Sequence, residues 1–143
     1  MVEKRFVYRL EALKRIKEWD KADATQKVAK EIEVLDRKEK VQAEVEANCD
    51  LAQEAIRNLC REDTDLDPVN YEMARAWLGG LSADLEESRK ATNEAHKRVE
   101  DAKETLVGKH RDYRVMEKHQ NRSYGAHRSS QLLRAYKTSD ELW

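Results

Sequence analysis

Apolar residues recur along this chain at alternating steps of four and three, the spacing of a left-handed coiled coil. In the first half of the chain these steps join Val45, Cys49, Ala52, Ile56 and Leu59. No glycine or proline occurs from Phe6 to Asp67, whereas an average globular helix has only about 11–12 residues. The pattern predicts a first helical arm over about residues 6–62.

The same spacing continues in the second half of the chain. It joins Ala95, Val99, Ala102, Leu106, Lys109, Tyr113 and Met116. Asp67 is a suitable N-cap and Pro68 a suitable first helical residue, so a second arm is expected over about 68–137, after a turn at about 63–67. A turn this short folds the arms back antiparallel, paired about Leu66. We therefore predict an all-α fold, a long antiparallel two-helix coiled-coil hairpin forming one domain over residues 1–143.

Two irregularities interrupt this pattern. Apolar residues at steps of four and three also occur earlier in the chain, in two groups. The first group is Phe6, Leu10 and Leu13, and the second is Val28, Ile32 and Leu35. Between Leu35 and Val45 the phase slips, with Val41 fitting one register and Gln42 the other. This predicts a stutter, which locally unwinds a supercoil. Gly79-Gly80 predicts either a softened turn or a place where another surface approaches closely.

Charged residues make up 40% of the chain, yet the formal net charge is only −1. The charge is unevenly spread, because Glu44–Glu72 holds nine acids against two bases and Leu106–Lys137 holds eight bases against two acids. We expect an acidic end at the turn and a basic end at the termini, which would orient the hairpin between unlike partners. The near-neutral total argues against a dedicated nucleic-acid-binding protein.

The residues that usually carry catalysis or metal binding form no recognisable motif. There is no glycine-rich phosphate loop, and the four histidines make no His-Glu-x-x-His pattern. Cys49 and Cys60 match no metal or redox spacing and are expected to be small apolar residues near the seam. We expect no catalytic residue, cofactor or metal, and no enzyme activity. No run of 18 apolar residues and no secretion signal occur, which predicts a cytoplasmic protein without membrane insertion.

Two apolar stripes crowd the start of the second arm, more than one two-stranded seam is expected to bury. One contains Ala74, Leu78, Leu81 and Leu85, with Tyr71 nearby. The other contains Met73, Trp77, Gly80 and Asp84. We expect the first stripe to face a partner. Trp19 and Trp143 are further candidates for contacts, since tryptophan is enriched at interface hot spots.

The opening Phe6-Val7-Tyr8-Arg9-Leu10-Glu11-Ala12-Leu13, followed by Ile16-Lys17, resembles the start of FliJ and SctO proteins. These are coiled-coil stalk proteins of flagellar export and virulence type III secretion. The resemblance extends to two arms of similar length, an acidic turn, Asn70-Tyr71 opening the second arm, and Asp140-Glu141-Leu142 near the end.

The resemblance implies a non-enzymatic stalk that inserts its terminal end into a hexameric secretion ATPase and promotes ring assembly and activity. It also implies contact with the cytoplasmic domain of the export-gate membrane protein, and with some export chaperones, at the inner membrane. When this chain is matched to the family at Asn70-Tyr71, the resemblance implies export-gate binding by Tyr71, Ala74, Leu78, Leu81 and Leu85. ATPase-ring binding is expected at the basic end, on Arg9, Arg15, Arg111, Arg114 and Lys118.

Two other functions fit the same residues. One is a soluble coiled-coil export chaperone or adaptor that acts without an ATPase and holds clients on its spare stripe. The other is nucleic-acid binding through Lys109–Lys137, where Tyr113, Tyr124 and Tyr136 are interleaved with bases. The acidic turn and the neutral total charge count against the latter.

Overall fold

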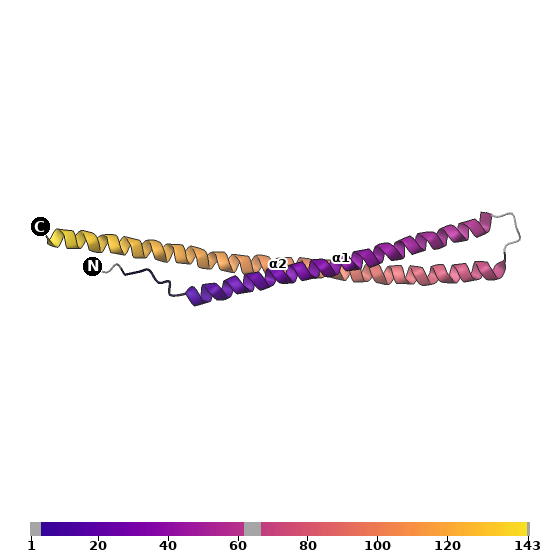
Figure 1. Cartoon of the computed structure of the whole chain (residues 1–143), viewed down its shortest axis with the longest axis horizontal. Helices are drawn as coiled ribbons and strands as arrows, with labels where there is room; N and C mark the ends of the chain where they lie inside the picture. The colour runs from indigo at the N-terminus through magenta and orange to yellow at the C-terminus, as the bar shows by residue number, and fades with distance from the viewer. Residues whose placement is uncertain (1–3, 62–66, 143) are drawn as a thin grey trace. The chain divides into compact units, whose positions relative to one another are not determined.

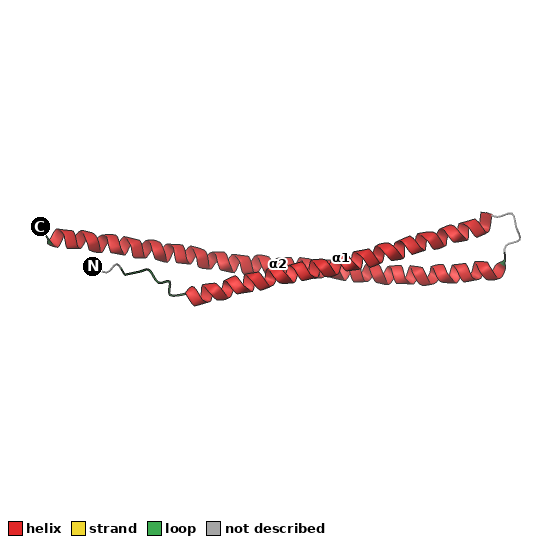
Figure 2. Cartoon of the chain, viewed as in Figure 1, coloured by secondary structure: helices red, strands yellow, loops and turns green. Residues whose placement is uncertain are grey.

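The protein is all-α, and its two helices pack against one another as a hairpin. The computed structural model describes residues 4–61 and 67–142. Helix α1 spans Glu11–Arg61 and helix α2 spans Pro68–Glu141 (Figure 1). Within the described ranges every regular element is helical (Figure 2). The predicted fold class is confirmed, while the predicted turn at 63–67 lies outside the described residues except for Asp67.

The start of α2 follows from its first residues. Oδ1 of Asp67 accepts a hydrogen bond from the Val69 amide at 3.1 Å, and the Asp67 carbonyl accepts one from the Tyr71 amide at 3.1 Å. Asp67 is therefore the N-cap, as predicted, and Pro68 occupies the first turn, where its missing amide hydrogen costs nothing. Helix α2 continues to Glu141, four residues beyond the predicted end of the arm.

The packing divides the chain into two compact units. The central unit comprises residues 28–102, and the terminal unit comprises residues 1–27 and 103–143. Each unit contains a portion of α1 and a portion of α2. Contacts inside each unit, such as Glu46 with Arg89 and Lys17 with Asp112, join early residues to late ones in antiparallel order. This order agrees with the predicted pairing about Leu66.

The core of the central unit is a seam of small residues. Ala52 is completely buried, and Cys49, Ala95 and Val99 are nearly so. Val45, Ile56 and Leu59 flank them half-buried, as the spacing predicts. Small side chains let two helices approach closely, so a thin layer of atoms excludes water from this seam. No large side chain of the described residues is fully buried.

The predicted stutter between Leu35 and Val45 is wrong. Helix α1 keeps its regular steps through Leu35, Lys38, Gln42 and Val45, with Gln42 half-buried and Val41 49% exposed. Half-burial of the Gln42 side chain costs little free energy, because its amide donates a hydrogen bond to Glu46 Oε1 at 3.1 Å. A hydrogen-bonded glutamine thus preserves the supercoil where an apolar residue would have required a phase change.

The apolar register predicted for the first part of the chain is wrong at Leu10, Leu13 and Ile32, whereas Phe6, Val28 and Leu35 of the same two sets are half-buried. Leu13 and Ile32 are exposed, at 40% and 46%, and the half-buried positions beside them are Lys14 and Glu31. In the terminal unit the inward-facing residues of α1 are Lys14, Lys17, Lys21 and the buried Ala24. Alternating steps of three and four counted back from Cys49 arrive at Lys21, Lys17 and Lys14 rather than at Leu13. The regular repeat of the long helix, rather than the positions of its apolar residues, therefore determines which side chains of α1 face α2.

The terminal unit also contains a non-helical N-terminal segment, residues 4–10, where a helix from about residue 6 was predicted. The Phe6 ring meets the Tyr124 ring edge-on, with centroids 5.3 Å apart. Tyr8 is buried, and its hydroxyl is hydrogen-bonded to Nδ1 of His119 at 2.7 Å. The Lys4 carbonyl accepts hydrogen bonds from the side chains of His127 and Gln131. These contacts with α2 hold the segment extended and delay the start of α1 to Glu11.

Candidate binding surfaces

The stripe expected to bind the export gate lies along the seam of the central unit. Tyr71, Ala74, Leu78, Leu81 and Leu85 are all half-buried, in the same 3-4 steps that lead on to Ser88, Thr92 and Ala95. The interpretation of this stripe as surplus to the seam is therefore wrong. Extending the phase of Ala95 and Val99 backwards would have identified it as the inward-facing stripe. Gate binding by these five residues stays a prediction.

The second stripe is the exposed one. Met73 is 67% exposed and Trp77 is 52% exposed, and both face away from the seam. Gly80 follows on the same side of α2, and nothing lies within 4 Å of the position that a Cβ would take there. The softened turn predicted for Gly79-Gly80 is wrong, since α2 is unbroken there, and no described part of this chain approaches either glycine. Close approach of another molecule stays a prediction. We call the surface of Met73, Trp77, Gly80, Asp84 and Glu87 the Trp77 face.

A shallow groove of about 350 Å³ adjoins the Trp77 face in the central unit. Val41 and Val45 of α1 and Ala91 of α2 give it apolar walls, while Asp84 and Glu87 contribute carboxylates. Neither carboxylate takes part in an ion pair within the described residues. Lys38 of α1 lines the same groove, so a basic side chain of this chain already lies beside the two carboxylates.

The five bases predicted to bind the ATPase ring all lie in the terminal unit and are exposed. Arg15 pairs with Glu11 at 3.8 Å, whereas the other four take part in no ion pair among residues 4–61 and 67–142. Arg111, Arg114 and Lys118 share the outward side of α2 with Val115 and Arg122. We call the surface of these five α2 residues the Arg111 face.

Charge separates between the two units. The sequence of the terminal unit contains 17 Lys and Arg against 10 Asp and Glu, a net charge of +7. The central unit contains 11 bases against 19 acids, a net charge of −8. These values add up to the −1 of the whole chain. Each unit therefore carries charge of one dominant sign, although the protein as a whole is nearly neutral.

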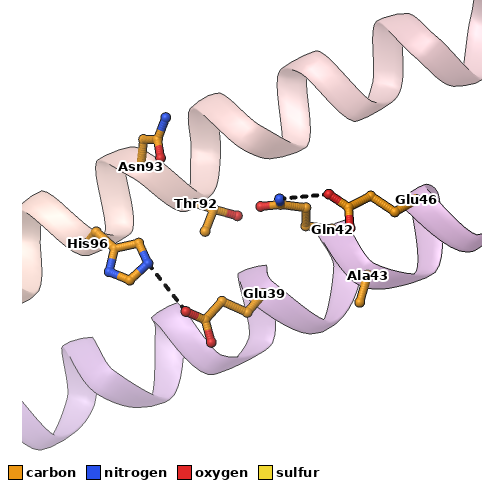
Figure 3. Close-up of a pocket in the computed structure, with 7 residues that line it drawn as sticks. All are labelled: Glu39, Gln42, Ala43, Glu46, Thr92, Asn93 and His96. Carbon is orange, nitrogen blue, oxygen red and sulfur yellow. Dashed lines mark hydrogen bonds and ion pairs between the residues drawn. The ribbon is translucent and has the colours of Figure 1, made fainter.

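A second groove of the central unit, of about 300 Å³, surrounds a polar layer of the seam. Figure 3 shows Thr92 pointing between the helices beside Gln42, with His96 and Glu39 facing one another. The buried Thr92 hydroxyl donates to the Ser88 carbonyl at 2.9 Å, and His96 Nε2 lies 3.3 Å from a Glu39 carboxylate oxygen. The groove is open and its polar groups satisfy one another, so it offers no preformed site for a substrate.

The four histidines are distributed over both units. His119 and His127 bind the N-terminal segment, His96 meets Glu39, and His110 is exposed. Among the described residues no group of three or more metal-ligating side chains comes together. Neither helix, over the same residues, includes an apolar stretch able to cross a membrane. Cys49 is buried in the seam as expected, whereas Cys60 is exposed.

The fold and these surfaces define a helical hairpin whose chemistry lies on its outer faces. Comparison with known proteins adds no closer assignment, because no family description, curated protein or solved structure matches this chain.

Proposed function

We propose that this protein is the non-enzymatic central stalk of a type III secretion or flagellar export ATPase complex. In this proposal the terminal unit inserts into a hexameric ATPase ring, promotes its assembly and activity, and the protein links the ring to the export gate. The site of action is the cytoplasmic side of the inner membrane, beside the secretion apparatus. The likeness of the Phe6–Leu13 opening to FliJ and SctO proteins supports the family.

The observation that carries the proposal is the row of unpaired bases on the terminal unit. Arg111, Arg114 and Lys118 have no carboxylate partner within the described residues, so their attraction remains available to another molecule. The proposal therefore requires an acidic contact surface inside the ring. Phe6 and Tyr8 pack against α2 within this chain, so their presence in the family-like opening needs no partner to explain it. The basic row is therefore the stronger support for the proposed function.

The test is binding and stimulation of a purified secretion ATPase. The triple variant Arg111→Glu, Arg114→Glu and Lys118→Glu should weaken co-sedimentation with the ATPase at least tenfold and abolish stimulation of hydrolysis. Raising salt should weaken binding of the wild-type chain, because exposed charges are screened within about 8–10 Å. A matched variant carries Lys30→Glu, Lys97→Glu and Arg98→Glu, three exposed bases of the central unit. It should behave like the wild type, and equal losses in both variants would contradict the proposal.

The gate contact is proposed for the exposed parts of Tyr71, Ala74, Leu78, Leu81 and Leu85. Because these residues also form the seam, alanine variants confound binding with stability. Replacing Leu81 by methionine preserves the seam volume and changes the exposed shape, so it is the informative variant. Reduced gate binding with unchanged thermal unfolding would support the assignment, and unchanged binding would exclude this position from the contact.

The exposed Trp77 face favours a second candidate, an export chaperone or adaptor that acts without the ATPase. Met73 and Trp77 give this face the apolar anchors that an amphipathic client helix would use. The two functions differ in one measurement. A stalk stimulates hydrolysis by the purified ATPase, whereas an adaptor of this kind leaves hydrolysis unchanged and binds clients alone.

A further inference from the structure

We propose that the Trp77 face binds the Arg111 face of a second copy of this chain, with the two α2 segments antiparallel. This self-association goes beyond the proposed function and needs no ATPase. It rests on two observations, namely an uncovered apolar face and charges of opposite sign on the two faces, and the helical repeat allows the two rows to be aligned.

The Trp77 face is shaped to receive another helix. Met73 and Trp77 stand exposed on it, and the next residue along this side is Gly80, around which there is open space. Tryptophan and methionine are enriched in the buried centres of interfaces, and a glycine lets a neighbouring backbone approach closely. The Trp77 face therefore offers two apolar anchors, Met73 and Trp77. The open space at Gly80 separates them from the carboxylates of Asp84 and Glu87.

The charges of the Trp77 face determine what can cover it. Asp84 and Glu87 have no ion-pair partner among the described residues, and the central unit has a net charge of −8. A contact between two Trp77 faces would join two surfaces of the same acidic unit and give Asp84 and Glu87 no basic partner, so it is disfavoured. The fitting occupant is a helix that carries exposed bases around small apolar residues.

Such a helix is present on the terminal unit of the same protein. Arg111, Val115, Lys118 and Arg122 follow one another at steps of four, three and four. Met73, Trp77, Gly80 and Asp84 follow one another at the same steps. Because the order 4-3-4 reads the same in both directions, the two rows match when the helices run antiparallel.

The antiparallel match produces chemically sensible pairs. Asp84 meets Arg111, Val115 fills the gap over Gly80, and Lys118 lies over the ring of Trp77. An ion pair and a cation–π contact both strengthen when the interface removes them from water.

The Arg111 face includes three of the bases proposed to bind the ATPase ring. If both contacts exist, a second copy and the ring compete for the same surface, and self-association is the resting state of the stalk. The experiments below use the purified chain alone, so their outcome does not depend on whether ring binding occurs.

Sedimentation equilibrium of the full chain tests self-association directly. We expect the mass to rise from 16.8 kDa towards twice that value with concentration in the micromolar range, and to fall back as salt increases. A single-chain mass at all concentrations would overturn the proposal. Gly80→Gln should weaken association at least tenfold by filling the gap. It should also raise helix stability, since glycine is less favourable in a helix interior than any residue except proline, so loss of folding cannot explain the result.

Gly79→Gln is the matched control for Gly80→Gln. It brings the same gain in helix propensity on the same turn, but points about 100° away from the Trp77 face. We expect it to associate like the wild type. Equal effects of the two substitutions, or no effect of Gly80→Gln, would overturn the assignment of the face.

A charge exchange tests the register and the contact between copies. Asp84→Arg alone and Arg111→Asp alone should each associate at least tenfold more weakly than the wild type. Mixing these two variants should restore association, because each then supplies the charge that the other lacks. The doubly exchanged chain, D84R with R111D, should also self-associate. Failure of the mixture and of the double variant, with helicity intact by circular dichroism, would overturn the pairing of Asp84 with Arg111.

Discussion

Lys21 lies over the ring of Tyr113, with Nζ 5.0 Å from the ring centroid. Lys14 approaches the same ring at 5.9 Å and also donates to the Gln120 side chain. A seam position that would hold leucine in a simple coiled coil is thus occupied by lysine stems on an aromatic face. The arrangement explains how the terminal unit keeps a regular register while Leu10 and Leu13 are exposed.

Tyr113→Leu is predicted to lower the stability of the terminal unit by about 0.5–1 kcal/mol, because leucine offers no aromatic face to Lys14 and Lys21. Tyr113→Phe keeps that face and should unfold like the wild type. Thermal unfolding followed by circular dichroism compares the three proteins. Equal losses for leucine and phenylalanine would assign the effect to the tyrosine hydroxyl instead.

Tyr8→Phe is predicted to destabilise the contact of the N-terminal segment with α2 by about 1 kcal/mol, because it removes the hydroxyl bonded to His119. Amide hydrogen exchange of residues 4–10 should become faster while exchange in the central unit stays the same. Tyr124→Phe is the control, since the Tyr124 ring meets Phe6 without a hydroxyl contact in the same cluster. Faster exchange in both variants would mean that ring packing, rather than the hydrogen bond, holds the segment.

Leu78→Ala with Leu85→Ala is predicted to lower the melting temperature of the protein. Both leucines are half-buried in the seam, and each truncation should cost about 1–2 kcal/mol, less than in a full core. Met73→Ala with Trp77→Ala removes two exposed side chains and should change stability much less. The reverse ranking would mean that the outward stripe, rather than the inward one, faces α1. At low protein concentration, below the range of self-association, the comparison reports on folding alone.

Asp67→Ala is predicted to cost about 1 kcal/mol, because the Val69 amide loses its carboxylate acceptor at the first turn of α2. Asp67→Asn retains a side-chain oxygen and should recover most of that loss. Chemical denaturation, with both variants measured beside the wild type, gives the free energies of unfolding. An alanine variant as stable as the wild type would show that the cap contributes nothing to the fold.

The sequence was sufficient for the elements of this fold. The absence of glycine and proline before Asp67, the Asp67-Pro68 start signal and the 3-4 steps from Ala95 to Met116 specify two long helices and much of their seam. These are local signals, since backbone propensity, capping and helical periodicity each depend on neighbours within a few residues. The exposed bases of the Arg111 face could be identified in the same way.

The orientation of each helix about its own axis required the tertiary structure. Leucine at 13 and isoleucine at 32 look like better seam residues than Lys14 and Glu31, yet a long regular helix cannot satisfy every local preference in one phase. The buried residues Cys49, Ala52, Ala95 and Val99 mark that phase in the central unit, and Leu78 rather than Trp77 lies on the seam in the same phase. Which stripe remains outside to meet another molecule is therefore a consequence of packing between helices, which no local pattern determines.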